Sequence, residues 1–157
     1  MAVYLLLGDD DERKARGVEK LRGGRSPDSY DAAESSPEAV VSACNSYSLF
    51  GGGAFVLVRN LDAWNAAQKA VITAYLQNPA PETDLVMLGT KLGAREKLLS
   101  AVKASGEVHN FEQPTGRALV KWAVGHAQKS GLDLPEDVAG FLVGRCSEDK
   151  SRIISEI

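Results

Sequence analysis

Seven residues near the N-terminus, 8–14, occupy a position that could bind phosphate. They read Gly-Asp-Asp-Asp-Glu-Arg-Lys and follow a short apolar run, and at this point α/β nucleotide-binding proteins hold phosphate on backbone N–H groups. A phosphate loop needs the glycines and lysine of the pattern G-x-x-x-x-G-K-[ST]. Here the four consecutive carboxylates of residues 9–12 would repel a triphosphate. The segment therefore predicts an ordinary helix start, capped by Asp9 or Asp10.

The apolar run of residues 54–58 ends where a phosphoryl-transfer enzyme would hold magnesium. Such an enzyme places a pair of carboxylates at the end of this strand, where they bind the metal ion that stabilises the reaction. Here Arg59 and Asn60 follow the run, and Asp62 is displaced by two residues. An aspartate in a solvated turn explains Asp62 better than a lone metal ligand. We therefore predict no metal site, no cofactor and no catalytic residue.

Residues 47–53 place two large apolar side chains in a predicted surface loop. They read Tyr-Ser-Leu-Phe-Gly-Gly-Gly, between a helix end and the next strand. Burying Leu49 and Phe50 against another protein would contribute roughly 3–6 kcal/mol, at about 1.5–3 kcal/mol per side chain, which is enough for an interaction hot spot. The same side chains could instead fold back under the sheet. The residues alone leave both interpretations open.

Along the chain, apolar runs alternate with helical patterns as far as residue 112. The runs predict strands at residues 3–7, 29–32, 54–58, 84–88 and 108–111. Apolar residues spaced three or four apart predict helices near residues 10–21, 37–47, 67–75 and 94–102. In the third helix the predicted apolar stripe consists of Ala67, Ala70, Val71, Ala74 and Tyr75. This alternation predicts an α/β fold with a mostly parallel sheet and helices on both faces.

After Pro114 the alternation stops, and only helical patterns follow. They lie near residues 119–126, 135–143 and 147–157. We therefore predict an α/β domain at residues 1–112 and a small helical domain at residues 113–157. The last pattern reaches Ile157 without a glycine, a proline or another stop signal, so we expect the chain to be truncated.

Composition and charge narrow the class of protein further. Eighteen basic and 21 acidic residues give a net charge of −3. A chain with this net charge has no overall positive electrostatic field that would attract the phosphates of DNA. Cys44 and Cys146 lie far apart and outside any C-x-x-C pair, which argues against a disulfide framework or a zinc site. The first residues lack a basic segment, and their apolar run is too short to span a bilayer. We therefore expect a folded cytoplasmic protein without a membrane partner.

Several segments in order resemble the delta subunit of the bacterial DNA polymerase III clamp loader. They are Tyr4-Leu5-Leu6-Leu7-Gly8-Asp9-Asp10, Ser48-Leu49-Phe50, Phe55-Val56-Leu57-Val58-Arg59-Asn60, Asn78-Pro79-Ala80-Pro81-Glu82-Thr83-Asp84, Trp122 and Ser155-Glu156-Ile157. Their order and spacing are similar to those of the family over essentially the whole chain.

The resemblance implies an AAA+ type fold, which is P-loop NTPase-like. In such a fold, a mostly parallel sheet with helices on both faces is followed by a small helical lid. Delta subunits resemble AAA+ modules that have lost the phosphate loop and the acidic pair. The resemblance therefore implies a subunit that is not catalytic by itself within the DNA-directed DNA polymerase III holoenzyme, a nucleotidyltransferase complex. ATP hydrolysis would then belong to other loader subunits.

The resemblance also implies partners. In the family, the Ser-Leu-Phe segment inserts into the hydrophobic pocket of the ring-shaped beta sliding clamp. By position, Leu49 and Phe50 would form this plug, flanked by Ser48 and by Tyr47, where some members have another apolar residue. Binding would open the ring so that it can be loaded on DNA during replication. The other clamp loader subunits would bind a collar domain that this chain lacks, and DNA would be bound indirectly or weakly.

The alternative interpretation is a DNA-binding AAA+ like module without clamp contact. The DNA backbone could be contacted by Lys14, Arg16, Arg22 and Arg25. This interpretation predicts tight DNA binding whose affinity falls steeply as the salt concentration rises. An active phosphoryl-transfer enzyme is a further alternative, but it requires a phosphate loop that the sequence does not contain.

Overall fold

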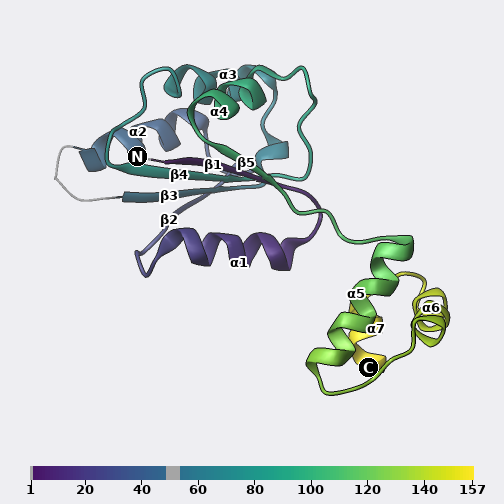
Figure 1. Ribbon diagram of the computed structural model, residues 1–157. Coiled ribbons are helices and arrows are strands. Elements are labelled where there is room, and N and C mark those ends of the chain that lie inside the picture. The colour runs from purple at the N-terminus through teal and green to yellow at the C-terminus, as the bar shows by residue number, and fades with distance from the viewer. Residues whose placement is uncertain (1, 49–53) are drawn as a thin grey trace. The chain divides into compact units, whose positions relative to one another are not determined.

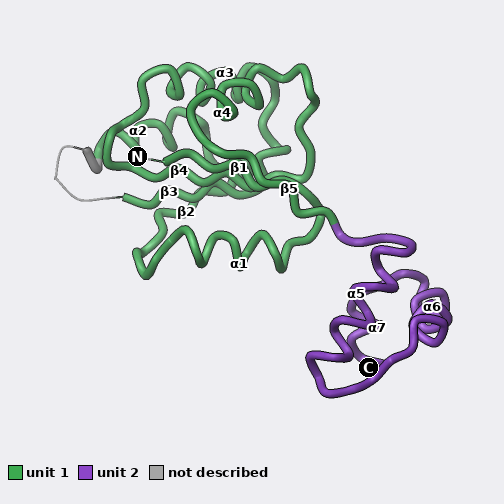
Figure 2. Tube along the Cα trace, viewed as in Figure 1, with its two compact units in different colours: residues 1–112 green, residues 113–157 purple. Residues whose placement is uncertain are grey.

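The computed structural model describes residues 2–48 and 54–157. The chain divides into two compact units, Met1–Glu112 and Gln113–Ile157 (Figure 2). The first unit combines strands and helices, and the second contains helices in its described residues. Within the described ranges, no helix is both long and apolar enough to cross a membrane.

A five-stranded sheet with the order β2-β3-β4-β1-β5 forms the centre of the first unit (Figure 1). Its strands are β1 (Val3–Leu7), β2 (Asp28–Asp31), β3 (Ala54–Arg59), β4 (Thr83–Leu88) and β5 (Glu107–Asn110). Every neighbouring pair of strands is parallel, so each connection has to cross a face of the sheet. The α/β fold predicted from the sequence is confirmed.

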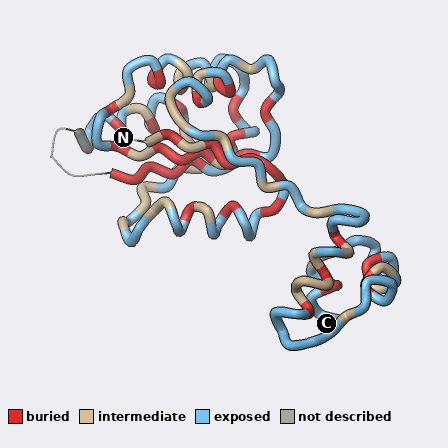
Figure 3. The backbone as a smooth tube through the Cα atoms, in the orientation of Figure 1, coloured by how far each residue is buried: buried red, intermediate tan, exposed pale blue. Residues whose placement is uncertain are grey.

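Helices cover both faces of this sheet (Figure 1). One face carries α1 (Asp11–Arg22), and the other carries α2 (Pro37–Ser48), α3 (Ala66–Tyr75) and α4 (Lys97–Ser105). Alternate strand residues point to opposite faces, so Leu6 packs in the cluster of Val18 on α1, whereas Leu5 packs with residues of α2 to α4. Figure 3 shows the strands as the most continuously buried part of the unit.

Local capping signals define several helix boundaries. Asp10 caps α1 by accepting a hydrogen bond from the Arg13 N–H at 3.2 Å, as the sequence predicts. Gly23 ends the same helix in the left-handed conformation, with φ of 58°. The helix predicted from residue 94 begins later, at Lys97, because a turn precedes it in which the Glu96 N–H donates to the Gly93 carbonyl.

The predicted apolar stripe of α3 is largely wrong. Of its members, Ala67, Ala70 and Ala74 are exposed and Val71 is half-buried. Tyr75 is buried, together with Ile72, which the stripe did not include. Alanine is only weakly apolar and is compatible with either face, so the contacts of α3 with α2 and α4 decide which face is buried.

The second unit consists of three helices around its own core. These are α5 (Gly116–Lys129), α6 (Glu136–Arg145) and α7 (Lys150–Glu156). The short 3-10 helix η1 (Leu61–Ala63) belongs to the first unit. Leu119 and Ala123 of α5 pack with Val143 of α6 and Ile153 of α7. Each helix therefore contributes an apolar face to one small core.

Candidate functional site

The segment that connects α2 to β3 is the first candidate site. Helix α2 ends at Ser48 and β3 begins at Ala54, and Ala54 lies at the amino-terminal end of the parallel strands. Ligands of open α/β sheets bind at the opposite, carboxyl ends. Tyr47 and Ser48 are the last two residues of α2. Leu49 and Phe50, the predicted plug, lie outside the described residues.

The end of α2 is fixed to the start of β4 by buried polar contacts. The Thr83 hydroxyl donates to the Cys44 carbonyl at 3.0 Å, and Thr83 is only 1% exposed. Beside it, the Ala54 N–H donates to the Glu82 carbonyl at 3.2 Å, which holds the first residue of β3. The backbone is therefore held by hydrogen bonds at Cys44 in α2 and at Ala54, the first residue of β3.

Cys44 of α2 and Tyr75 of α3 form a buried, neutral pair. Burial raises the pKa of the Cys44 thiol to about 11 and the pKa of the Tyr75 hydroxyl to about 12. The Tyr75 hydroxyl also accepts a hydrogen bond from the Ala80 N–H at 3.1 Å. A protonated, buried thiol is a poor nucleophile, so Cys44 has a structural role.

The turn between β1 and α1 is the second candidate site, because it lies at the carboxyl ends of the strands. Lys14 is 7% exposed, and its ammonium group donates to the Gly89 carbonyl at 3.3 Å and pairs with Asp11 at 3.1 Å. Gly8 has a φ of 111°, and a Cβ there would lie 2.2 Å from the Phe111 carbonyl oxygen. The chain's own backbone and carboxylates thus occupy the surroundings of this turn.

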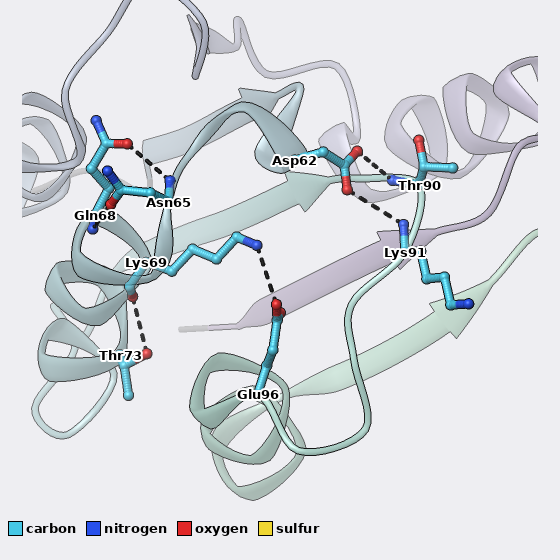
Figure 4. Close-up of polar contacts among 8 residues, drawn as sticks. All are labelled: Asp62, Asn65, Gln68, Lys69, Thr73, Thr90, Lys91 and Glu96. Carbon is cyan, nitrogen blue, oxygen red and sulfur yellow. Dashed lines mark hydrogen bonds and ion pairs between the residues drawn. The ribbon is translucent and has the colours of Figure 1, made fainter.

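Asp62 is engaged at the same edge of the sheet. Its carboxylate accepts hydrogen bonds from the backbone N–H groups of Thr90, at 2.8 Å, and Lys91, at 3.4 Å (Figure 4). Asp62 therefore shapes the turn after β4, which agrees with the structural role predicted for it. A cavity of about 360 Å³ lies nearby, and carboxylates of Asp11 and Asp62 line it. In the part of the chain that the structure describes, no three side chains of His, Cys, Asp or Glu form a metal-binding group.

The four basic residues of the DNA-binding alternative all have partners in their own chain. The carboxylate partners are Asp11 for Lys14, Glu12 for Arg16, Glu19 for Arg22 and Asp84 for Arg25. The Arg25 guanidinium also lies over the Phe55 ring, at 5.2 Å from its centroid. Each of these charges is therefore partly compensated before any phosphate approaches.

Two residues that shape these sites were not predicted from the sequence. Thr83 was named only within a segment that resembles the family, and Lys14 only in the first turn and among the possible DNA contacts. The available signal for Thr83 is a hydroxyl at the start of a largely apolar strand, since a buried hydroxyl needs a hydrogen-bond partner. Lys14 has no such signal, because its burial depends on the distant Gly89.

The strand order, the helices on both faces and the following helical unit define an AAA+ type module, and solved structures with this fold are similar to it. The Bacillus subtilis DNA clamp loader delta protein (YqeN) matches with a TM-score of 0.70 and 20% identity, over 99% of this chain and 51% of that one. A RuvB mutant of Thermotoga maritima matches with a TM-score of 0.56 and 12% identity, over 90% and 48%. The Walker-type ATPase paby2304 of Pyrococcus abyssi matches with a TM-score of 0.55 and 13% identity, over 90% and 57%.

The family follows from the sequence comparison. The family described as DNA polymerase III, delta subunit, matches residues 27–112, which is more than half of the 157 residues. The chain belongs to the DNA polymerase III delta subunit family, so the resemblance predicted from its segments is confirmed. The chain spans about half the length of the Bacillus subtilis structure. No curated protein matches the sequence.

Proposed function

We propose that this chain binds the beta sliding clamp and opens its ring during DNA replication, with Leu49 and Phe50 as the apolar plug. Tyr47 and Ser48 flank the plug at the end of α2. The observation that carries the proposal is the pair of large apolar residues between α2 and β3 in a member of the delta subunit family. Two such side chains can anchor a protein interface.

The surroundings of the segment support this role. A docking element needs a rigid base, since flexibility of the base would add an entropic cost to binding. The hydrogen bond from Thr83 to Cys44 provides this base on the helix side, and the pairing of Ala54 with Thr83 provides it on the strand side. Ala54, the first residue of β3, lies at the amino-terminal end of the parallel strands, whereas the Lys14 turn follows the carboxyl end of β1. Clamp contacts next to Ala54 therefore need not compete with that turn.

Ring opening follows from binding by a shift of population. A ligand moves a conformational equilibrium only through its different affinities for the two states. The plug and the surface around it would therefore have to bind the open ring more tightly than the closed ring. Opening the ring in this way requires no covalent reaction step.

The proposed role is not catalytic. A triphosphate would meet four consecutive carboxylates, residues 9–12, and the one lysine of the turn already donates to Gly89. At the end of β3, where a phosphoryl-transfer enzyme has a pair of metal-binding carboxylates, this chain has Arg59 and Asn60. We therefore assign ATP hydrolysis to other subunits of the loader.

The experiment that tests clamp binding measures the Kd for the beta clamp of the same organism by surface plasmon resonance. The double variant Leu49→Ala plus Phe50→Ala should weaken binding by at least about 100-fold, since roughly 3 kcal/mol or more would be lost. The matched control is Leu132→Ala plus Phe141→Ala, which removes two exposed apolar side chains of the second unit. Equal affinity of the plug variant and the wild type would refute the proposal.

The DNA-binding alternative has a different outcome. It predicts tight binding of duplex DNA without the clamp, with an affinity that falls steeply as salt increases. Charge removal at Arg16 and Arg22 should then weaken DNA binding and leave the clamp Kd unchanged. We expect instead weak DNA binding, because both guanidinium groups are paired with glutamates of α1.

A further inference from the structure

The outer surface between α3 and α4 contains a groove of about 520 Å³, here called the α3–α4 groove. Ala66, Ala70 and Ala74 line its α3 side at intervals of four residues, and Leu98 lines its α4 side. Side chains four apart in a helix lie one above the other, so the alanines form a smooth apolar strip. All three are exposed. The strip leaves room for larger apolar side chains from outside.

One end of the groove carries an ion pair that is incompletely satisfied. The Lys69 ammonium lies 3.5 Å from the Glu96 Oε1 atom, and the Lys69 side chain is only 14% exposed (Figure 4). Among the described residues, the other carboxylate oxygen of Glu96 is buried without a hydrogen-bond partner. An ammonium group has three donors, and this long contact uses one of them. The pair can therefore rearrange when another acceptor approaches Lys69.

Positive charge lies on the segment that leads into α4, and one of its cations, Lys97, lines the groove. Lys91, Arg95 and Lys97 are exposed and lie within seven residues that lead into α4. In the described ranges, none of these three side chains has an ion pair with a carboxylate. The Asp62 carboxylate contacts the Lys91 backbone, and Figure 4 shows the Lys91 side chain extending away from it. A local excess of cations thus exists in a chain whose net charge is −3.

We propose that the α3–α4 groove binds an acidic amphipathic segment of a partner protein. Apolar side chains of the segment would lie over Ala66, Ala70 and Ala74, in the way that helices dock their apolar faces into grooves. Its carboxylates would face Lys97 and accept from Lys69, which would release Glu96 from the long contact. Charge complementarity of this kind selects the partner and orients it.

The lining favours a peptide over a nucleic acid. Single-stranded nucleic acids bind largely by stacking their bases on aromatic side chains, and the residues that line the groove include no aromatic ring. The alanine strip instead offers apolar contact to aliphatic side chains. This surface is formed by α3 and α4, so the inference stands whether or not the segment after α2 binds the clamp.

The test uses the whole chain and two labelled probe peptides. The first is a helix-forming peptide with leucines on one face and glutamates on the other, and the second replaces every glutamate by lysine. Fluorescence anisotropy measures the Kd of each, and NMR shifts of Ala70, Ala74 and Leu98 locate the contact. We expect the acidic peptide to bind at least about tenfold more tightly than the basic one, because only it complements Lys97 and its neighbours.

Three variants sharpen the test. Ala70→Leu fills the groove and should weaken binding of the acidic peptide about tenfold or more, since a filled groove excludes the apolar face. Lys97→Glu should also weaken it, whereas Glu96→Gln should strengthen it by removing the carboxylate that competes for Lys69. Ala74→Leu serves in place of the first variant if circular dichroism shows that Ala70→Leu misfolds.

The proposal is overturned if the acidic peptide binds no better than the basic one, or if groove-filling variants bind it as the wild type does. Labelled oligothymidylate is the remaining probe. If it binds more tightly than the acidic peptide and loses affinity with Lys97→Glu, the surface is a nucleic-acid site and the peptide proposal is wrong.

Discussion

The Thr83 hydroxyl donates a hydrogen bond of 3.0 Å to the main-chain carbonyl of Cys44, and both residues are buried. The two residues are 39 positions apart, at the start of β4 and in the last part of α2. One side-chain hydroxyl thus connects the helix that precedes the proposed clamp-binding segment with an interior strand of the sheet.

Thr83→Val should therefore destabilise the protein. Valine has nearly the same shape but cannot donate to the Cys44 carbonyl, and the loss of one such hydrogen bond costs about 0.5–1.5 kcal/mol. The free energy of unfolding, measured in urea, should fall by that amount. The matched control is Thr73→Val, where the lost bond lies within one helix turn, to the Lys69 carbonyl, and we expect a change below about 0.5 kcal/mol. Equal effects of the two variants would contradict the connecting role of Thr83.

Gly8→Ala should be strongly destabilising. Position 8 has a φ of 111°, and an added Cβ would lie 2.2 Å from the Phe111 carbonyl oxygen, so backbone must move. We expect a loss of roughly 2–4 kcal/mol in the free energy of unfolding, measured by thermal and urea denaturation.

Gly140→Ala provides the matched control for the Gly8 variant. Gly140 lies inside α6, and a Cβ there would meet nothing within 4 Å. Alanine favours helix over glycine by up to about 1 kcal/mol, so this variant should stabilise the second unit. A similar loss of stability in both variants would show that close packing at Gly8 is not the cause.

The free energy of unfolding should decrease in alkaline solution. The ordinary pKa of a thiol is 9.0, and burial raises the pKa of Cys44 to about 11 in the folded state. Unfolding therefore lets the thiol ionise between these values, so the stability present below pH 9.0 is lost as the pH rises toward about 11. Tyr75, raised from 10.0 to about 12, extends the loss. Cys44→Ala should retain only the tyrosine part in urea titrations across this range.

ATP with magnesium should leave the melting temperature unchanged. A ligand present at one hundred times its Kd would add about 2.7 kcal/mol to the free energy of unfolding, which thermal melting detects easily. We expect no such shift, because Asp11 and Asp62 line the cavity beside Lys14. A clear rise with ATP, together with measurable ATP turnover, would contradict the non-catalytic role.

Helix and strand positions could be predicted well from local sequence. The apolar run that begins at Val3 became β1, and Asp10 and Gly23 cap α1 as their types suggest, because these signals act within a few residues. The candidate segment with Leu49 and Phe50 was also predicted locally, from two large apolar residues beside three glycines. The α3–α4 groove was not predicted, because two of its alanines, Ala70 and Ala74, were interpreted as members of a buried stripe.

The amino-acid sequence by itself determined the alternation of strands and helices, the missing phosphate loop and the family of the chain. Only the tertiary structure decided that Lys14 donates to Gly89, that Gly8 packs against Phe111 and that Thr83 holds Cys44. The physical reason is distance along the chain. Capping and periodicity depend on neighbours within one or two turns, whereas these three contacts join segments that meet only once the parallel strands have taken the order β2-β3-β4-β1-β5.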